Sequence, residues 1–563
     1  MRIFIKILCF FFCLCIFASV TFSQKTDLEF NLDINAKTLP LSIIFSPSID
    51  LSGRGYHTQV NWPYSLASKE IISRWYSEIG FQKGLYRIYF NLWELQKVEN
   101  DPLLQQTILS NYEKIIKIIS DSAGKIILVL YGTPPGWGKV LDKRSFPMDL
   151  KLWQDYIRLI INYFSAEKKY PVWYEVWSAP DSESFFLGTE KDYFTLYEAT
   201  AKVIKELKAK NKINIMLGGP GSSWWFQNIQ DNSIFSAERS LIYGLIKFCS
   251  QKKLPLDFIS WHAFSDDPLI ECERTVYGKT PVQLIRAWLE YFNFNKDTPL
   301  IISEWNYDAG YNWDELRSEK SYVTAGFMLS RLKSMYETGI DYQTYFCLED
   351  FQNNKEGINV NRGVFSYSTD NPTISNAKSL YNIFLFLNQL GDRMYGCFSL
   401  DEFAQILVTR RNEDIIVILW NYIDPYLGRH YLFRNITLFN EKERKFIIDL
   451  FKSLKLEDAI YGKNSIPLFS ENLRSFFKKA QQLQHKADTF KDKKRYIKLN
   501  FTNFKGNYLY QRYTLNAQCN WDCQFLPTEE KIVAGEEGTY QDNLEVAPYS
   551  VELIIFKKEI TQK

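Results

Sequence analysis

The 563-residue sequence lacks a strong charge of either sign and is short of residues that bind metals. It carries 67 Lys and Arg residues against 65 Asp and Glu residues, a formal charge of +2. Phosphate binding needs a clustered positive surface, and the sequence shows none. Histidine occurs only at His57, His262, His430 and His485, and no close set of four His and Cys residues is present. The sequence therefore argues against nucleic-acid binding and predicts no structural zinc site.

Long apolar runs are absent beyond the first residues. Arg2 and Lys6 precede an unbroken apolar run from Ile7 to Ala18, and small residues follow. This pattern is typical of a cleaved secretory signal, so we expect residues 1–23 to be a signal peptide and the protein to be secreted or periplasmic. No later stretch approaches the roughly 18 uncharged apolar residues that span a bilayer, which predicts no integral membrane segment after signal cleavage.

Cysteine is also sparse for a chain of this length. Six of the nine cysteines lie beyond the predicted signal, and they are too thinly spread to form a disulfide scaffold. Cys519 and Cys523 are the only close pair among them. Export would permit a disulfide at this pair, and two free buried thiols are an equally acceptable interpretation.

Aromatic residues, in contrast, are abundant. The chain holds 42 Phe, 35 Tyr and 15 Trp, and with 46% hydrophobic and 23% charged residues its composition is that of a large folded protein. Aromatic side chains either build a thick core or floor a site for ring-shaped ligands, and the core role is the more common of the two.

Short runs rich in Val, Ile, Tyr and Phe alternate with helix-length segments through the first two thirds of the chain. Eight such alternations predict parallel strands with crossover helices, and eight strands are the number that closes a (β/α)8 TIM barrel, an α/β fold. We place the barrel at residues 53–392. The expected strands are 56–61, 84–91, 125–131, 171–177, 212–217, 256–262, 299–304 and 341–347, and the expected helices are 68–78, 105–120, 150–164, 193–208, 238–250, 281–291, 321–337 and 374–390.

The pattern changes after Gly391 to short alternating strands. Segments such as 403–409, 415–421, 497–501 and 551–556 predict a C-terminal antiparallel β domain over residues 393–563. A lysine-rich stretch of helical composition near 471–494 indicates a helical insertion in that domain. The segment 24–52 has alternating apolar positions and could add a strand to the same domain.

Chemistry in such a barrel lies at the C-terminal ends of the strands. The seventh predicted strand ends in LIISEWN, which places Glu304 at the rim beside Trp305. A carboxylate at this position can attack or stabilise a developing cation. An ion-paired rim residue with no chemical role is an equally good interpretation of the spacing alone.

Several strand ends resemble glycoside hydrolase family 39, which contains xylosidases and iduronidases. The resembling motifs run from about residue 53 to 390 and are GLYRIYF with Arg87, LYGTPPGW with Trp137, YEVWSAPDSESFF after the fourth strand, LGGPGSSWW after the fifth, and FISWHAF with His262. The resemblance implies that Glu304 matches the catalytic nucleophile and that the substrate is a carbohydrate. It is silent on which sugar is bound.

The same resemblance places an alanine where the family has its acid/base glutamate. That glutamate falls on Ala179, and the neighbouring Asn, which contacts a sugar hydroxyl in the family, falls on Ser178. Two further departures are Phe264, where the family motif carries Tyr, and Tyr89, where members often carry His. Retaining glycosidases need two carboxyls about 5–5.5 Å apart, so half of the catalytic pair is missing.

Other carboxyls near the gap are weak substitutes. Asp181 and Glu183 follow Ala179 on a loop and could supply a proton if they reached within about 2.6–3.2 Å of the leaving oxygen. Glu175 precedes Ala179 by four residues, about 13 Å down the strand, and is better explained as a polar residue of the barrel interior.

The remaining rim residues have a binding and a structural interpretation each. Arg87 could keep Glu304 ionised or pair inside the barrel, and we expect His262 to belong to the site. His57 could lie at the mouth of the first strand. The tryptophans that could stack on sugar faces or simply pack are Trp137, Trp224, Trp225, Trp305 and Trp313.

Two functions follow as hypotheses. The first is a secreted glycosidase that cleaves O-glycosidic bonds of a polysaccharide or oligosaccharide by a retaining mechanism, with Glu304 as nucleophile. The second is a pseudo-glycosidase that binds saccharide without turnover because Ala179 replaces the acid/base. No metal or organic cofactor is implied, because this chemistry needs two carboxyls and water.

Overall fold

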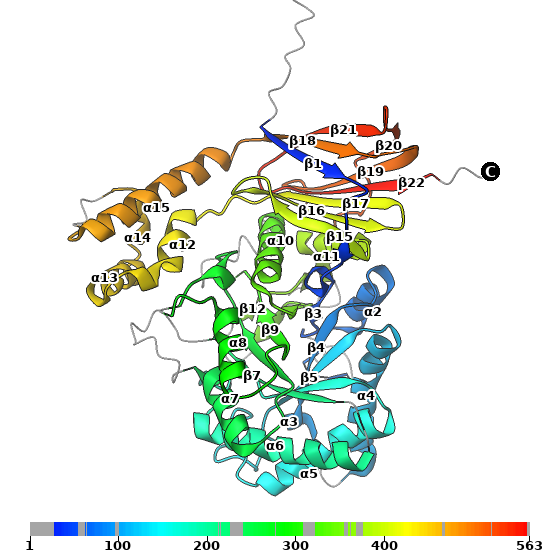
Figure 1. Cartoon of the computed structure of the whole chain (residues 1–563). Helices are drawn as coiled ribbons and strands as arrows, with labels where there is room; N and C mark the ends of the chain where they lie inside the picture. Colours follow the sequence, from blue (N-terminus) through cyan, green and yellow to red (C-terminus); the bar gives the residue numbers. More distant parts are fainter. Residues whose placement is uncertain are drawn as a thin grey trace, which may run out of the picture.

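The computed structural model shows a barrel, a β domain stacked on it and a group of helices projecting to one side (Figure 1). It describes residues 27–53, 62–63, 65–95, 101–211, 213, 215–225, 240–275, 277–307, 321–353, 358–360, 362–367, 375–463, 468–519 and 521–559.

Eight strands close a barrel in the order in which they occur in the chain, and all neighbours that pair are parallel. This arrangement confirms the predicted fold class. The strands are β3 (Ile49–Asp50), β4 (Leu85–Asn91), β5 (Lys125–Tyr131), β6 (Val172–Val176), β7 (Met216–Ser222), β8 (Phe258–His262), β9 (Leu300–Trp305) and β10 (Tyr342–Tyr345).

The first barrel strand differs from the prediction. The segment 56–61, predicted as strand one, lies outside the described residues, and the strand that pairs with both β4 and β10 is β3. The barrel therefore begins before residue 53. Because β3 contains only two residues, it shows no alternation from which a strand can be recognised in the sequence.

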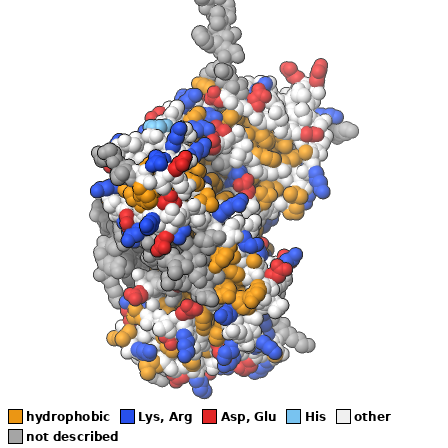
Figure 2. Space-filling view, turned by 60° about the vertical axis from the view of Figure 1, so that its left-hand side comes forward, with side chains coloured by type: hydrophobic (Ala, Val, Ile, Leu, Met, Phe, Trp, Pro, Cys, Tyr) orange, Lys and Arg blue, Asp and Glu red, His pale blue; other side chains and the backbone are white. Residues whose placement is uncertain are grey.

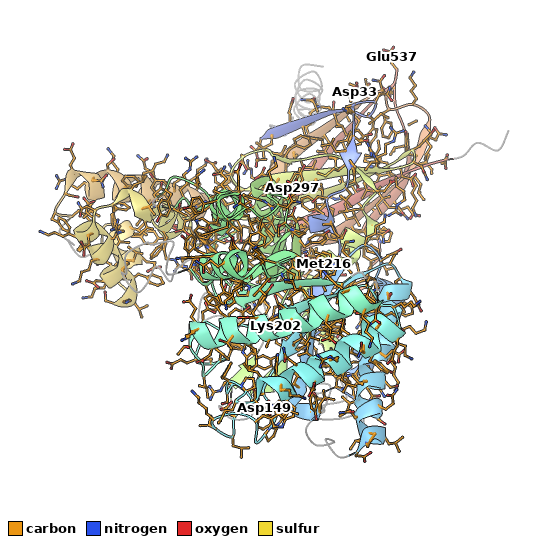
Figure 3. All side chains as sticks on the ribbon, turned by 60° about the horizontal axis from the view of Figure 1, so that its bottom comes forward. Asp33, Asp149, Lys202, Met216, Asp297 and Glu537 are labelled. Carbon is orange, nitrogen blue, oxygen red and sulfur yellow. A yellow bond between two sulfur atoms is a disulfide. The ribbon has the colours of Figure 1, made fainter. Side chains whose placement is uncertain are left out.

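Helices cover the outside of the barrel, as Figure 3 shows for α5, which begins after the labelled Asp149, and for α6, which contains the labelled Lys202. Asp149 caps α5 by accepting hydrogen bonds from the backbone N–H groups of Lys151 and Leu152 at 2.8 and 3.0 Å. The helices are α2 (Lys69–Glu78), α3 (Leu92–Leu95), α4 (Pro102–Asp121), α5 (Leu150–Ile161), α6 (Glu190–Asn211), α7 (Leu241–Lys252), α8 (Pro281–Tyr291), α10 (Ser321–Thr338) and α11 (Ser379–Gln389), with short helical turns η1 (Ile43–Phe45), η4 (Asn162–Glu167) and η7 (Ile270–Cys272).

Two small hairpins follow β10 before the chain enters α11. They pair β11 (Phe351–Asn353) with β12 (Ile358–Val360) and β13 (Phe365–Tyr367) with β14 (Ser375–Ala377), each antiparallel.

The β domain consists of two sheets. The larger sheet has the order β2 (Leu39–Pro40), β15 (Arg393–Ser399), β16 (Ala404–Arg411), β17 (Asp414–Asn421), β22 (Val551–Lys558), β19 (Asn507–Leu515) and β20 (Glu529–Ala534). The smaller sheet has the order β1 (Leu28–Asp33), β18 (Arg495–Thr502) and β21 (Thr539–Val546). Apolar side chains of both sheets form one core, which includes Val417 and Leu499.

The N-terminal segment joins this domain, as the alternating apolar positions suggested. β1 pairs in parallel with β18, and β2 pairs antiparallel with β15. The β domain is therefore built from both ends of the described chain, with the barrel inserted between them.

A helical arm, defined here as residues 427–490, follows β17 of the larger sheet and leads into β18 of the smaller sheet (Figure 1). Only its last helix falls in the segment predicted to be helical. The arm has a small apolar core of its own that includes Leu432, Ile447 and Phe477. Its helices are α12 (Leu427–Arg434), α13 (Glu441–Lys452), α14 (Leu456–Ile460) and α15 (Glu471–Phe490), with a short turn η8 (Ile436–Leu438).

The arm is anchored to the barrel by a buried histidine. The Nδ1 atom of His430 lies 2.7 Å from Asp424 Oδ2, and its Nε2 atom lies 3.1 Å from Oδ1 of Asp266, which belongs to the loop after β8. Arg434 Nε lies 3.4 Å from Asp267 on the same loop. Burial alone would lower the pKa of His430, but the surrounding carboxylates outweigh it and raise the pKa to about 10.

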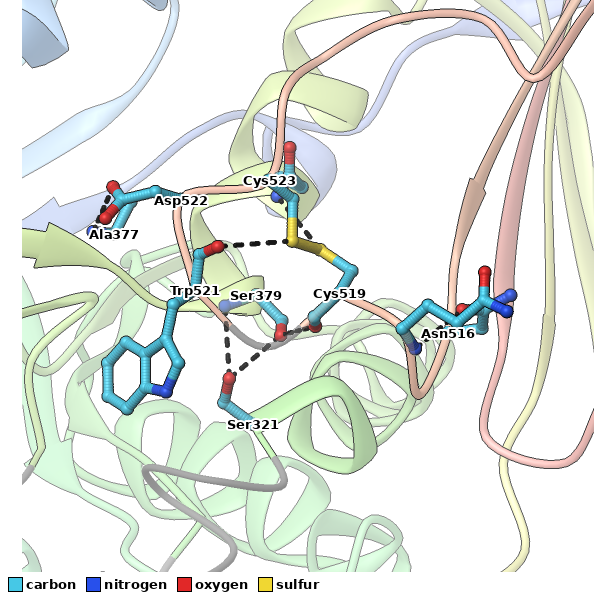
Figure 4. The surroundings of a disulfide bond; sticks show 10 residues. Ser321, Ala377, Ser379, Asn516, Cys519, Trp521, Asp522 and Cys523 are labelled. Atoms are coloured by element: carbon cyan, nitrogen blue, oxygen red, sulfur yellow. Dashed lines mark hydrogen bonds between the residues drawn. A yellow bond between two sulfur atoms is a disulfide. The ribbon is translucent and has the colours of Figure 1, made fainter.

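A disulfide joins Cys519 to Cys523 in a loop of the β domain (Figure 4). The loop contacts the segment that leads into α11: Asp522 accepts a hydrogen bond from the backbone N–H of Ala377 at 2.9 Å, and the Ser379 hydroxyl donates to the Cys519 carbonyl. The bridge thus stiffens a loop that holds the β domain against the barrel.

The surface has a mixed charge. On the face shown in Figure 2, Lys and Arg side chains alternate with Asp and Glu side chains, and apolar groups lie among them. Among the described helices, none combines the length and the apolarity needed to cross a bilayer.

Replacing His430 with Gln is expected to destabilise the protein more at low than at high pH. The folded-state pKa is raised from 6.5 to about 10, so the contribution of the charged ring is complete below about pH 6.5 and is lost as the pH rises through 10. Removing one partner of a buried ion pair costs about 3–5 kcal/mol, and we expect a loss of this order at pH 6.

Urea denaturation of the wild type and the variant near pH 6 and near pH 10 measures this difference. The matched control is His485→Gln, because His485 is exposed on α15. An equal loss of stability at both pH values would show that the His430 ring is not held in its charged form.

Candidate functional site

Arg87 lies at the centre of a buried charge network inside the barrel. It belongs to β4 and is fully buried. Its Nη1 atom donates hydrogen bonds to Asp50 Oδ2 at 3.0 Å and to Glu304 Oε1, while Nε and Nη2 donate to Glu175 Oε2 at 2.9 and 2.7 Å. One guanidinium therefore holds three carboxyls, which come from β3, β6 and β9.

The three carboxyls do not behave alike. Burial raises the pKa of Asp50 to about 6, although the positive charge of Arg87 opposes this shift. Glu175 is fully buried and accepts two of the hydrogen bonds from Arg87 on one oxygen, whereas its Oε1 atom has no hydrogen-bond partner in the described chain. Of the three, only Glu304 is not completely buried, with 3% of the residue exposed.

Glu304 has one oxygen held and the other left for a ligand. Its Oε1 atom accepts hydrogen bonds from Arg87 and from the Tyr89 hydroxyl, the latter at 2.5 Å, and lies 3.5 Å from His262 Nε2. Burial opposes ionisation of Glu304, but neighbouring positive charge and the hydrogen bonds from Tyr89 and Arg87 hold its pKa below the ordinary value. Within the described chain no hydrogen bond reaches Oε2, so this oxygen is the one that can contact a substrate.

Tyr89 connects the ends of β4, β6 and β9. Besides its bond to Glu304, its hydroxyl lies 2.7 Å from the Ser178 hydroxyl, which in turn lies 3.4 Å from Arg87 Nη2. The departures from the family pattern at Tyr89 and Ser178 therefore lie next to each other and share hydrogen bonds. Their polar groups still surround the carboxylate of Glu304.

His262 ends β8 and lies beside Glu304. It is 3% exposed, and its Nε2 atom has no hydrogen-bond partner in the described chain. Burial lowers its pKa, with the negative charge of Glu304 opposing the shift, so the ring is neutral at neutral pH. A neutral imidazole with one unpaired nitrogen can hydrogen-bond to a ligand at the barrel mouth.

Ala179 lies one residue beyond Ser178 on a sharply bent backbone. Trp177 and Ala179 have φ of +67° and +45°, a left-handed conformation that residues other than glycine seldom adopt. The Ala179 N–H donates to the Gly221 carbonyl at 2.7 Å, and the Ala179 carbonyl accepts from the Ser182 N–H at 3.0 Å. The turn is therefore pinned to the end of β7, and the side chain it presents is a methyl group.

Asp181, the predicted substitute acid, is engaged elsewhere. It is exposed, and its two carboxylate oxygens accept hydrogen bonds from the N–H and the hydroxyl of Ser223, each at 2.7 Å. This pair links the loops after β6 and β7. Asp181 thus acts as a bridge between two loops in this structure.

Trp305 packs into the barrel wall and does not face the site, contrary to the prediction of a substrate contact. Its side chain is fully buried, its indole N–H donates to Gln343 Oε1 at 2.7 Å, and its ring stacks edge-on against Tyr345. Successive residues of a strand point to opposite faces, so the residue after the inward-facing Glu304 must point outward.

The other predicted aromatic contacts are mostly packing residues. Trp137 is 8% exposed and stacks edge-on against Tyr156 with ring centroids 4.6 Å apart. Trp225 is buried, whereas Trp224 is half-buried at the end of β7. His57 and Trp313 lie outside the described residues.

Asp50 is a residue of this charge network that the sequence motifs did not predict. It ends β3, and its Oδ1 atom also accepts the Ser52 N–H at 2.9 Å. It was missed because the first strand was predicted further along the chain, and the two residues of β3 show no alternation that could have revealed it.

Within the described chain, Asp267, Asp424 and His430 bring three potential metal-ligand atoms within 4.8 Å of one another. Asp424 and Asp266 already engage both ring nitrogens of His430, and Arg434 lies beside Asp267. These contacts make the group an ion-pair network that anchors the arm.

The sequence matches the model of a known protein family. A family model described as glycosyl hydrolases family 39 matches residues 136–430. A β-xylosidase of Geobacillus stearothermophilus is 25% identical over 298 residues, which are 49% of this chain and 53% of that protein. A β-xylosidase of Caldicellulosiruptor saccharolyticus is 26% identical over 133 residues, 23% of each chain. The chain therefore spans about half the length, or less, of these curated relatives.

Solved structures share the fold over nearly the whole chain. A GH39 enzyme from Xanthomonas axonopodis pv. citri superposes with a TM-score of 0.64 at 14% identity, covering 96% of this chain and 99% of that one. A monomeric β-xylosidase from Caulobacter crescentus gives a TM-score of 0.62 at 14% identity, covering 95% and 100%. At such identities the likeness shows the fold alone.

The family match extends over more than half of the sequence and includes the strand ends that carry Ser178, His262 and Glu304, so the chain belongs to glycoside hydrolase family 39.

Proposed function

We propose that the protein is a glycosidase that forms a covalent glycosyl-enzyme on Glu304 and acts on O-glycosidic bonds of a polysaccharide or oligosaccharide. The observation that carries this proposal is the state of Glu304. Its carboxylate is ionised and held through Oε1 by Arg87 and Tyr89, and Oε2 is left for attack on an anomeric carbon. A retaining mechanism begins with such an attack.

Arg87 and Tyr89 position the nucleophile in this reaction. Hydrogen bonds from charged or well-aligned donors fix the carboxylate and favour its ionised form. His262 and Ser178 present further polar groups at the same end of the barrel, where sugar hydroxyls could be bound. The residues of the site therefore support binding of the sugar and the first bond-forming step.

The sugar we propose is β-xylose or a closely similar pyranose. Two curated relatives are β-xylosidases, and they share about a quarter of their residues with this chain over the matched regions. No cofactor is needed for the step at Glu304, because carboxylate and sugar supply all the reacting atoms.

Binding of saccharide without turnover is the second candidate function. Ala179 favours it, because the position of the family's acid/base glutamate carries only a methyl group. Glu175 Oε1 and His262 Nε2 are buried and have no hydrogen-bond partner in the described chain. A site that binds saccharide without cleaving it would still keep these two polar atoms. Covalent labelling of Glu304 distinguishes the two functions, because only a protein that forms the glycosyl-enzyme becomes labelled.

We infer that the protein is secreted or periplasmic. The leader-like residues 1–23 lie outside the described residues, and the support from the structure is the disulfide between Cys519 and Cys523. Disulfides persist in oxidising compartments and are rare in the cytosol.

Replacing Glu304 with Gln is expected to abolish covalent labelling of the protein. An activated dinitrophenyl xyloside with fluorine beside the anomeric carbon forms a long-lived ester with a carboxylate nucleophile, and this step needs no acid from the protein. Mass spectrometry of the intact wild type should show one added fluoroxylosyl group, and peptide mapping should place it on Glu304. Glu175→Gln is unsuitable as a control because Glu175 binds Arg87, so Asp181→Asn is used. A folded wild type that remains unlabelled would favour binding without turnover.

Replacing Tyr89 with Phe is expected to move the acid limb of the pH–rate profile to higher pH. The Tyr89 hydrogen bond helps to hold the pKa of Glu304 down, so its loss raises that pKa and removes activity at low pH first. A hydrogen bond to a charged group contributes about 1.5–3 kcal/mol, which corresponds to a shift of about one to two pH units.

The measurement is kcat/KM for an activated aryl glycoside across the acid range. Tyr131→Phe is the matched control, because its ring packs edge-on against Tyr89 while its hydroxyl, within the described chain, makes no hydrogen bond to Glu304. An unchanged acid limb in Tyr89→Phe would contradict the assigned role of this hydroxyl.

A further inference from the structure

In the described part of the barrel mouth, the nucleophilic half of a two-carboxyl site is complete, and the position that the family resemblance gives to the second carboxyl is Ala179. Glu304 is held through Oε1 by Arg87 and Tyr89. Tyr89 also contacts Ser178, and the next residue is Ala179, which is 1% exposed. The loss of the titratable group is therefore local, because the nucleophile and its hydrogen bonds remain in place.

The backbone fixes the position of the methyl group. Ala179 is tied through its N–H to the Gly221 carbonyl and through its carbonyl to the Ser182 N–H. Its φ of +45° belongs to a conformation that the surrounding structure must enforce. Because the turn is pinned on both sides, Asp181 cannot exchange places with Ala179 without breaking these bonds and those to Ser223.

Among the described residues, the three other carboxyls considered for the site are committed to different partners. Asp50 accepts hydrogen bonds from Ser52 and Arg87, and Glu175 accepts two from Arg87. Asp181 accepts two from Ser223. Each of these three carboxyls is therefore held by its partners as a hydrogen-bond acceptor, and among the described residues none of them is hydrogen-bonded to Glu304.

We propose, on the basis of the function proposed above, that this site exchanges glycosyl groups between anions. The donor is an aryl or acyl glycoside, whose bond from anomeric carbon to oxygen breaks with both electrons leaving on a phenolate or carboxylate. Glu304 Oε2 forms the new ester bond to that carbon. A small anion then attacks the same carbon and displaces the Glu304 carboxylate, and no proton is transferred in either step.

The missing carboxyl affects both steps in the same direction. Without an acid, a poor leaving group loses general catalysis worth about 10²–10⁴ in rate, whereas a stable anion departs unaided. In the second step, water attacks the glycosyl-enzyme slowly because no base removes its proton. An anion carries no such proton and attacks without a base. An ionised glutamate at position 179 would also repel an incoming anion, and the Ala179 methyl group does not.

The first test compares leaving groups. Full-length wild type, Ala179→Glu and Ala179→Gln are assayed on aryl xylosides ordered by the acidity of the released phenol and on methyl xyloside. We expect wild-type kcat/KM to fall steeply along the series, and Ala179→Glu to gain about 10²–10⁴-fold on the poorest leaving groups with little gain on the dinitrophenyl glycoside. Ala179→Gln adds the same bulk at the same strained position without an acid and should gain nothing.

The second test compares acceptors. Azide and formate are added to wild type turning over the dinitrophenyl glycoside. Wild type should turn over faster with either anion and should yield a glycosyl azide of retained configuration, whereas Ala179→Glu should not be accelerated. A flat dependence on the leaving group, or hydrolysis that neither anion alters, would overturn the proposal.

The two proposals fail in different ways. If the activated fluoroxyloside does not label Glu304 in folded protein, the glycosidase function itself is wrong, and the exchange proposal falls with it. If Glu304 is labelled but the poor leaving groups are cleaved as fast as the good ones, the function stands, and the protein has an acid that the exchange proposal denies.

Discussion

The sharing of one buried guanidinium among three carboxyls determines how this barrel mouth works. Arg87 cannot lose its proton, so its charge is permanent, and Asp50, Glu175 and Glu304 compete for it. Asp50 and Glu175 are completely buried, whereas Glu304 is 3% exposed and has one oxygen to which no hydrogen bond is made within the described chain. Leaving a buried charge without its partner would cost free energy. The orientation of Glu304 therefore depends on β3, β4 and β6, which carry the other members of the network, as well as on its own strand.

The fold was largely predictable because its signals are repeated. Parallel strands that alternate with crossover helices leave a periodic pattern over hundreds of residues, so an error in one strand does not change the architecture. The strand at Ile49–Asp50 escaped detection because two residues cannot show a period. The first helices of the arm escaped because their apolar faces are short and pack against one another in a separate small core.

For the candidate site, some residues were predicted from the sequence and others were not. Glu304, Arg87 and His262 follow from strand ends, and the structure brings these three together. Trp305 was misplaced because neighbouring residues of a strand face opposite sides, and its indole packs towards Gln343. Asp50 was missed with its strand. The partners of Asp181 could not be foreseen, since they depend on how two loops meet in space.

The loop after β8 serves two parts of the molecule. It begins immediately after His262 at the barrel mouth, and within a few residues it reaches Asp266 and Asp267, which hold His430 and Arg434 of the arm. The histidine beside the nucleophile and the carboxylates that anchor the arm are therefore neighbours along one short piece of backbone, so the sequence of this loop has to satisfy both the barrel mouth and the attachment of the arm.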